Sequence, residues 1–384
     1  MKHISRTARS AAIAVATAAA TALLAVPASA VTADHAHRPA SGSPVFVQSD
    51  NTAGNTVVAY DRAADGSLTR AGVYSTGGLG GVLAGSVADH LASEGSLAYD
   101  QAHHLLYAVN AGSNTVTVFA VHGDRLTQTQ VLPSGGTFPV SIAVHGNLVY
   151  VLNALDGGSI QGYVREGKGL VAVASWNRAL GLDPTATPQF THTPGQISFT
   201  PDGSALVVTT KAAGNSIDVF PLGTFDAPAA QPAVNAEPGT VPFGFTFDQA
   251  GRLQVTEVGP GTVASFTISR EGTLRALGSA ATAQAATCWI VRAGDRLYTS
   301  NAGSGTLSGF QDSASDGTLT PLGNTATDPG TVDAAATPDG RFLYVQTGAD
   351  GIVDSFRVNT DGTLTATGSV TVPGAVGGEG IAVG

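Results

Sequence analysis

The segment that decides the fold is Leu106-Tyr-Ala-Val-Asn-Ala-Gly-Ser-Asn-Thr-Val-Thr-Val-Phe119. Two runs of alternating apolar and polar residues flank a turn of small and polar residues, which is the pattern of a β-hairpin. The same phrase recurs along the chain, and each copy closes with an aromatic residue. The closing residues are Tyr60, Phe119, Tyr163, Phe220, Phe266, Phe310 and Phe356. Seven copies predict seven repeated units.

Further strands flank most of these hairpins. A shorter strand precedes the hairpin, as in Gln196-Ile-Ser-Phe-Thr-Pro-Asp-Gly203, and another follows turns such as Asp361-Gly-Thr-Leu364. Four strands at a period near 45 residues are typical of a β-propeller blade. We therefore predict an all-β, seven-bladed β-propeller with four-stranded blades over residues 44–384. Two stacked sandwiches or a β-helix are the alternatives.

The two ends of the repeat region favour the propeller. The first copy begins at Val45 without a preceding inner strand, and the last copy is followed by a surplus strand, Gly380-Ile-Ala-Val-Gly384. We expect the C-terminal strand to pair into blade one and to close the ring, because that pairing removes an exposed sheet edge.

Composition excludes several classes of protein. The 384 residues include 12% charged and 43% hydrophobic residues, so the chain is neither intrinsically disordered nor a coiled coil. The net charge is -10, and no basic patch is evident, so we expect no nucleic-acid partner. Cys288 is the single cysteine, which rules out an intramolecular disulfide.

The N-terminal segment has the pattern of a targeting signal. Lys2, Arg6 and Arg9 precede an apolar stretch, which ends in Pro27-Ala-Ser-Ala30. A charged start, a short apolar middle and a small-x-small ending predict a signal peptide over residues 1–30, with a transmembrane anchor as the alternative. Residues 31–43 read as a disordered leader. We expect a secreted, extracellular protein that does not insert into a membrane.

The mouth of the channel is the expected site of chemistry. Two long connections, Thr76–Glu94 and Trp176–Gly195, should rise on one rim, and long loops in a compact repeat are often functional. Glu94, Asp333 and Glu379 open inner strands and should face one cavity. Converging carboxyls can act as acid and base or hold Ca²⁺ or Mg²⁺, and the alternative is three solvated surface acids. Because no metal-ligand motif is present, we expect no cofactor.

Further candidates come from the same loops and strand ends. His192 and Arg178 lie on the second long connection and join the three acids as candidate catalytic residues. The candidate ligand-binding residues are His90, Gln196, Trp176 and Cys288. A lone loop histidine is as readily explained as a solvated side chain, and a lone cysteine as a buried, inert one.

The blade phrases carry a resemblance to a known family. Leu106–Phe119 and Thr200-Pro-Asp-Gly203 resemble the lactonase-type seven-bladed propellers, which include 6-phosphogluconolactonase, carboxymuconate-cyclase and YVTN-repeat relatives. The resemblance covers Val45 to Gly384 and implies a site at the channel mouth. That family typically has a Pro-Arg-His piece before an inner strand that ends in His-Pro-Asp-Gly. Here Gly195 and Gln196 replace the Arg and the His, and Thr200 replaces the second His.

Two functions follow as hypotheses. The first is a secreted lactonase-like hydrolase or isomerase that acts on a neutral lactone or sugar-acid derivative, since an acidic mouth would repel an anion. The second is a non-catalytic extracellular propeller that binds a protein, a glycan or an envelope component. A small-molecule or glycan ligand is the expected partner. A monomer is the expected state, because a closed ring hides its own edges.

Overall fold

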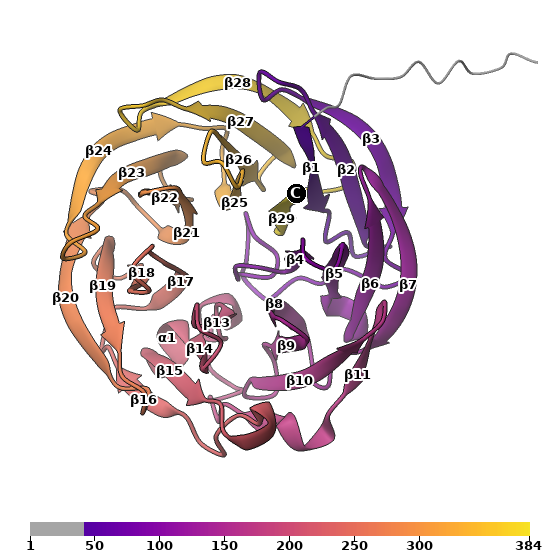
Figure 1. Ribbon diagram of the computed structural model, residues 1–384, viewed down its shortest axis with the longest axis vertical. Coiled ribbons are helices and arrows are strands. Elements are labelled where there is room, and N and C mark those ends of the chain that lie inside the picture. Colours follow the sequence, from indigo (N-terminus) through magenta and orange to yellow (C-terminus); the bar gives the residue numbers. More distant parts are fainter. Residues whose placement is uncertain (1–41) are drawn as a thin grey trace, which may run out of the picture. The chain divides into compact units, whose positions relative to one another are not determined.

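The β-strands form seven sheets around a central axis, as predicted. The computed structural model describes residues 42–384, so the predicted signal peptide (1–30) and nearly all of the predicted leader (31–43) lie outside the described residues. Figure 1 looks along the axis and shows one strand of each sheet at the centre. The first strand, β1, begins at Gly42, two residues before the expected boundary.

Each sheet is an antiparallel blade, and we number the blades 1 to 7 along the chain. From the axis outward, blade 1 consists of β29 (Ile381–Val383), β1 (Gly42–Gln48), β2 (Thr56–Arg62) and β3 (Leu68–Ser75). Blade 2 consists of β4 (Leu97–Asp100), β5 (Leu105–Asn110), β6 (Thr115–His122) and β7 (Arg125–Pro133). Blade 3 consists of β8 (Pro139–His145), β9 (Leu148–Asn153), β10 (Ser159–Glu166) and β11 (Gly169–Ala172), with β12 (Arg178–Ala179) also paired to β10.

The remaining blades follow the same order. Blade 4 consists of β13 (Ile197–Phe199), β14 (Ala205–Thr209), β15 (Ser216–Pro221) and β16 (Ala233–Ala236). Blade 5 consists of β17 (Pro242–Phe247), β18 (Leu253–Glu257), β19 (Thr262–Ile268) and β20 (Leu274–Ala281). Blade 6 consists of β21 (Thr287–Ala293), β22 (Arg296–Asn301), β23 (Thr306–Asp312) and β24 (Leu319–Ala326). Blade 7 consists of β25 (Thr331–Ala336), β26 (Phe342–Thr347), β27 (Ile352–Val358) and β28 (Leu364–Thr371).

In the described part of the chain, helical turns are confined to connections. They are α1 (Lys211–Gly214) and the 3₁₀ turns η1 (Ala111–Ser113), η2 (Ala174–Trp176), η3 (Gln189–Thr191) and η4 (Thr224–Asp226). Within residues 42–384 no helix is both long and apolar enough to cross a membrane.

The second strand of each blade lies in the core and supplies a tyrosine to several blade seams. All six residues of β26 are buried, because sheets pack against both of its faces. The Tyr344 hydroxyl donates to the Gly66 carbonyl of the next blade at 2.9 Å, and Tyr298 donates to Gly362 in the same way at 2.9 Å. Both acceptors are turn glycines with φ of +90° and +83°, a conformation that a side chain would strain.

The C-terminal strand closes the ring, as the sequence predicted. β29 pairs antiparallel with β1 in the register Val45↔Val383, Phe46↔Ala382 and Val47↔Ile381. The Gly384 amide extends this ladder by donating to the Pro44 carbonyl at 2.9 Å. The innermost strand of the first blade therefore comes from the far end of the chain.

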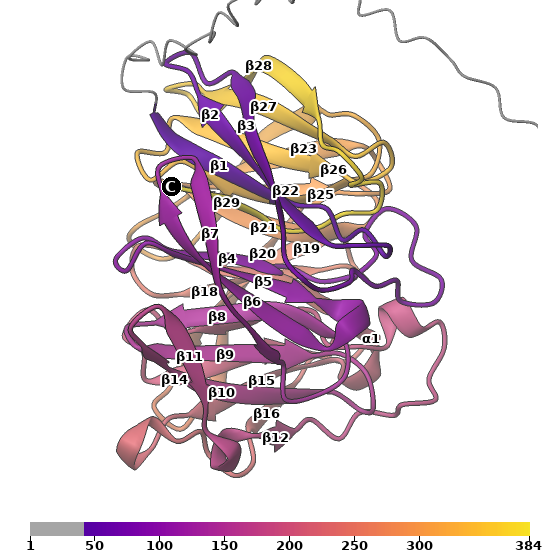
Figure 2. The same cartoon turned by 90° about the vertical axis from the view of Figure 1, so that its right-hand side faces the viewer.

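The two long connections lie on one rim and contact each other. The Ala84 amide donates to Gln189 Oε1 at 2.9 Å, and the Phe190 amide donates to the Ala84 carbonyl at 3.3 Å. Figure 2 shows both connections on the side of the ring away from the C-terminus. The rim that the sequence predicted is thus covered by two loops that are hydrogen-bonded to each other.

Candidate functional site

The mouth segment, which we define as Ala88–Glu94, runs across the channel at this rim. The Ser93 carbonyl accepts from Trp289 Nε1 of blade 6 at 2.6 Å, and the Ser93 hydroxyl donates to the Val140 carbonyl of blade 3 at 3.0 Å. The His90 amide donates to the Gly377 carbonyl, just before β29, at 2.8 Å. In Figure 1 the chain that leads into β4 runs inside the ring of innermost strands. The mouth segment therefore bridges opposite sides of the propeller.

Beneath this segment the three acids that open inner strands are brought together. Glu379 is fully buried, and its Oε1 accepts from the Gly95 and Ser96 amides at 2.9 and 3.3 Å. Asp333 accepts from the Ala334 amide at 2.8 Å and from the Ile381 amide at 3.2 Å, and it also shares a side-chain hydrogen bond with Glu379. These carboxyls are buried rather than solvated.

Glu94 reaches blade 6 from the end of the mouth segment. Its Oε2 accepts from the Ile290 amide at 3.1 Å. A methyl group on Gly244 would overlap this oxygen and would lie 2.6 Å from the Cys288 carbonyl oxygen. Glycine at position 244 thus makes room for the carboxyl.

Burial dominates the electrostatics of these acids. It raises the pKa of Glu94 and Glu379 well above the ordinary value, and the neighbouring Asp333 raises both further. It raises the pKa of Asp333 to about 6, against the opposing hydrogen bond from Glu379. Since a protonated carboxyl donates a proton and an ionised one accepts it, the cluster holds groups suited to both roles near neutral pH.

Two further buried acids belong to this cluster, and sequence reasoning missed them. Burial raises the pKa of Asp50 to about 8, although it accepts the Glu379 amide at 2.8 Å. Burial also raises the pKa of Asp89 to about 7, against the amide hydrogen bonds that it accepts from Ser93 and Leu91. Asp50 lies in the turn after β1 and Asp89 within a long loop, so neither opens an inner strand.

Lys211 is the cation beside the cluster, and sequence reasoning missed it too. Its ammonium donates to the Ala92 carbonyl at 2.6 Å, to the Phe190 carbonyl at 2.7 Å and to Thr193 Oγ1 at 3.0 Å. Burial lowers the pKa of Lys211 to about 7, while Asp89 favours its charged form. The usable signal was position, because Lys211 lies two residues after the end of a buried strand, in a chain with only 18 lysines and arginines.

Three predicted ligand-binding residues lie close to the mouth. Gln196 Oε1 accepts from the Phe245 amide at 2.6 Å, so the amide group links two innermost strands. Cys288 is buried, and burial raises the pKa of its thiol to about 12, which makes it a poor nucleophile. His90 packs on Gly377, its Nδ1 is buried without a hydrogen-bond partner, and partial burial lowers its pKa.

Arg178 and Trp176 are two of the three candidates on the second connection, and both pack against blade 3. The Arg178 guanidinium donates to the carbonyls of Ser175, Asn177, Pro228 and Ala229. Trp176 stacks on Tyr150 with ring centroids 5.9 Å apart. The structure does not bring these two side chains together with the acids of the mouth.

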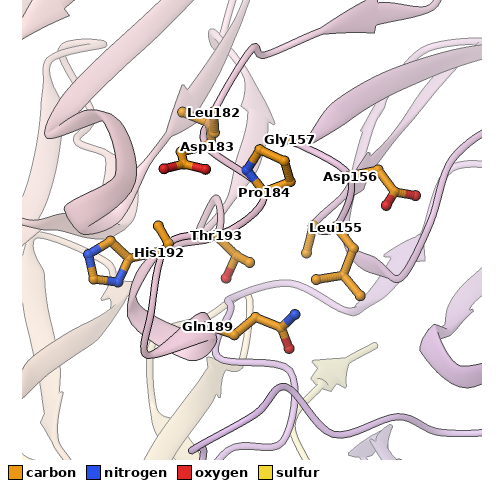
Figure 3. A pocket seen from close by; sticks show the side chains of 11 residues that line it. Leu155, Asp156, Gly157, Leu182, Asp183, Pro184, Gln189, His192 and Thr193 are labelled. Carbon is orange, nitrogen blue, oxygen red and sulfur yellow. The ribbon is translucent and has the colours of Figure 1, made fainter.

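His192 occupies a separate pocket at the rim. Its Nδ1 lies 2.9 Å from both the Pro188 carbonyl and Thr191 Oγ1. Figure 3 shows His192 and Asp183 on one side of this pocket and Asp156 on the other. Thr193, which also lines the pocket, accepts from Lys211, so the rim pocket adjoins the mouth.

The acids of the mouth were also considered as ligands for a cation. Over residues 42–384, no group of three or more His, Cys, Asp or Glu side chains is placed to hold a metal ion. The acids of the mouth instead accept hydrogen bonds from backbone amides of the innermost strands. The expectation of no cofactor stays a prediction, as does its alternative of Ca²⁺ or Mg²⁺ in the channel.

Comparison with known families agrees with the fold. The family model described as "Lactonase, 7-bladed beta-propeller" matches residues 87–378, a span that begins within the loop of the mouth. The chain belongs to this lactonase family. No curated protein matches it.

Solved structures similar to this lactonase-family propeller share its architecture at low identity. A putative 6-phosphogluconolactonase from Bacteroides fragilis has a TM-score of 0.73 and 18% identity, covering 90% of this chain and 98% of its own. The periplasmic gluconolactonase of Pseudomonas aeruginosa has a TM-score of 0.69 and 19% identity, covering 89% and 98%. Virginiamycin B lyase from Staphylococcus aureus has a TM-score of 0.53 and 13% identity, covering 75% and 87%. At these identities the likeness shows the fold.

Proposed function

We propose that this lactonase-family propeller is an exported hydrolase that opens a neutral lactone at the channel mouth, with Asp333 and Glu379 as the acid–base pair. The observation that carries the proposal is their hydrogen-bonded contact deep in the mouth, with Glu94 beside them. Two carboxyls that share a proton provide one group that accepts a proton and one that donates it. Export rests on the pattern of residues 1–30.

The proposed reaction needs no group beyond water and these carboxyls. The ionised carboxylate takes a proton from water as the water oxygen bonds to the lactone carbonyl carbon. The protonated carboxyl donates its proton to the carbonyl oxygen. When the tetrahedral intermediate collapses, the ring C–O bond breaks, and the ring oxygen leaves as a hydroxyl with the proton that was taken from water. The carbonyl oxygen returns its proton to the carboxyl that donated it, so both carboxyls regain their starting states. The product is a hydroxy acid.

The charges around the mouth favour a neutral substrate. A phosphorylated or carboxylated lactone would need a free cation, and Lys211 already donates to three acceptors. Five buried acids lie around the same point, namely Asp50, Asp89, Glu94, Asp333 and Glu379. Asp333, whose pKa of about 6 is the lowest given for the five, is ionised near neutral pH and would repel an anion placed there. Because these carboxyls are buried beneath the mouth segment, the proposed reaction requires this segment to move aside.

The proposed activity is tested by measuring acid release in a pH-stat. The substrates are glucono-δ-lactone and γ-butyrolactone, each corrected for spontaneous hydrolysis. We expect turnover of a neutral lactone, and a loss of about 100-fold in kcat in Glu379→Gln and Asp333→Asn, the scale on which a positioned acid or base acts. Glu271→Gln, on an exposed turn, is the matched control. Turnover that survives both substitutions would place the chemistry elsewhere.

A non-catalytic binding propeller is the second candidate function. It is favoured by Gly195 and Gln196, which stand where the resembling family has an Arg and a His, and by the commitment of Gln196 to a backbone amide. In that case the acids serve to cap the backbone amides of the innermost strands. Wild-type protein without turnover on any lactone, but with a thermal shift on glycan addition, would support this function.

A further inference from the structure

The face opposite the mouth contains a seam that differs from its neighbours. In blades 5, 6 and 7, the residue before the Leu of the second strand faces the Asp-Gly turn of the next blade. It is Arg252 in blade 5, Arg296 in blade 6 and Phe342 in blade 7. Arg252 donates to the Ser313 carbonyl at 2.7 Å, and Arg296 donates to the Thr360 carbonyl at 2.5 Å, so both bind the neighbouring turn. The side chain of Phe342 has no hydrogen-bond donor, and its ring packs on Gly66 instead.

A pocket lies at the seam where Phe342 stands in place of an arginine. It lies between blade 7 and the β2–β3 turn of blade 1 and has a volume of about 290 Å³, at the small end of the range for ligand pockets. Its polar lining consists of Arg341, Arg357, Asp65, Thr365 and Thr367. The volume suits one sugar-sized group.

Two arginine side chains at this pocket have guanidinium groups without a hydrogen-bond partner among the described residues. Arg341 and Arg357 are exposed, and within the part of the chain that the structure describes neither guanidinium makes an ion pair or a hydrogen bond. Arg341 lies over the Phe342 ring at 5.6 Å, and Arg62 lies over the same ring at 5.5 Å. Two acids are close by: Asp65 lines the pocket, and Asp339 has its Oδ1 held by Thr337 Oγ1 and the Arg341 amide. Three arginines and two acids therefore meet at this seam.

The rest of the pocket wall is suited to hydroxyl groups. The Thr367 hydroxyl is buried without a hydrogen-bond partner. Asp65 Oδ1 accepts from Ser67, while its other carboxylate oxygen accepts no bond from the described residues. Asp65 would repel a simple oxyanion such as sulfate, but it would accept hydrogen bonds from a polyol.

We propose that this seam pocket, formed by Arg341, Arg357, Asp65 and Thr367, binds a sugar acid through its carboxylate and hydroxyls. Guanidinium groups match the planar geometry of a carboxylate, and Asp65 and the threonines match the ring hydroxyls. The sugar acid is either a free monosaccharide or a uronate unit of an acidic polysaccharide. This site lies on the opposite face from the mouth and is independent of the proposed hydrolysis.

Isothermal titration of the full chain tests the proposal. The probes are glucuronate, polygalacturonate, glucose and sulfate. We expect binding of a uronate, at least tenfold weaker binding of glucose and of sulfate, and a loss of uronate affinity of at least tenfold in Arg341→Gln/Arg357→Gln. The matched control, Arg125→Gln/Arg275→Gln, removes two exposed arginines from outer strands and the same net charge, and should bind as wild type does.

The outcomes separate the sources of the sugar acid. Binding of glucuronate supports a free sugar acid, and binding of polygalacturonate alone supports a polysaccharide. The proposal is overturned if neither uronate binds, if sulfate binds as tightly as glucuronate, or if the two double variants lose affinity equally.

Discussion

Replacing Asp50 should change how the stability of the propeller depends on pH. Asp50 is 1% exposed, and burial raises its pKa from an ordinary 3.8 to about 8. Between about pH 5 and about pH 7 the folded chain therefore keeps this proton, whereas the unfolded chain has released it. Because the folded state binds more protons, the free energy of unfolding falls as pH rises through this window.

The size of the effect follows from one proton. A single group contributes about 1.4 kcal/mol per pH unit, or about 2.7 kcal/mol between about pH 5 and about pH 7. Asp50→Asn removes this contribution. The substitution also changes stability by an amount that does not depend on pH. Relative to wild type, the free energy of unfolding of the variant should therefore rise by about 2.7 kcal/mol between about pH 5 and about pH 7.

Urea unfolding at the two pH values measures this difference. Tryptophan fluorescence and circular dichroism should give coincident transitions, so that a two-state free energy applies. Asp65→Asn is the control: Asp65 is exposed, hydrogen bonds from Ser67 lower its pKa, and it is ionised in both states at both pH values. A stability difference for Asp50→Asn that stays the same at both pH values would refute the burial argument.

Three further predictions concern packing around the mouth and the closure. Gly244→Ala should lose about 1–3 kcal/mol, because the methyl group displaces Glu94, whereas Gly278→Ala, with nothing within 4 Å of its added carbon, should unfold like wild type. Lys211→Met leaves the Ala92 and Phe190 carbonyls without their donor, so we expect the free energy of unfolding to fall by about 2 kcal/mol or more. Proteolytic cleavage within 77–93 should also occur earlier, which gel electrophoresis and mass spectrometry would detect. Ile381→Ala removes a buried side chain from β29 and should cost about 2–5 kcal/mol in urea unfolding, more than Val383→Ala at a half-buried position; equal losses would contradict the packing described here.

The blades could be predicted from the sequence because their signals are local. Alternation with period two and turns such as Asp361-Gly362 depend on residues close together in the chain. Counting strands then predicted the closure, since Gly380–Gly384 had no other partner. The acids Glu94, Asp333 and Glu379 were found together because each opens an inner strand, and the ring places all such starts on one rim.

The rest of the mouth depends on contacts between distant segments. Asp89 and Lys211 are placed by the packing of two long loops, which no local pattern encodes. The sequence suggested that Arg178 projects from a loop, but four carbonyls hold it against blade 3 and the loop 228–229. The burial of the acids also follows from tertiary structure, because the sequence indicated that Glu94, Asp333 and Glu379 converge without showing what covers them.

The pairing of β29 with β1 also sets the order in which the molecule can be completed. Val45 and Val383 are register partners, so blade 1 lacks its innermost strand until almost the whole chain has left the ribosome. Such distant contacts form slowly, and until they form, β1 presents an open edge that other chains can join. A product that lacks β29 would have six complete blades and a first blade in which the inner edge of β1 is unpaired. Products that end before Ile381 should therefore aggregate, because they lack β29.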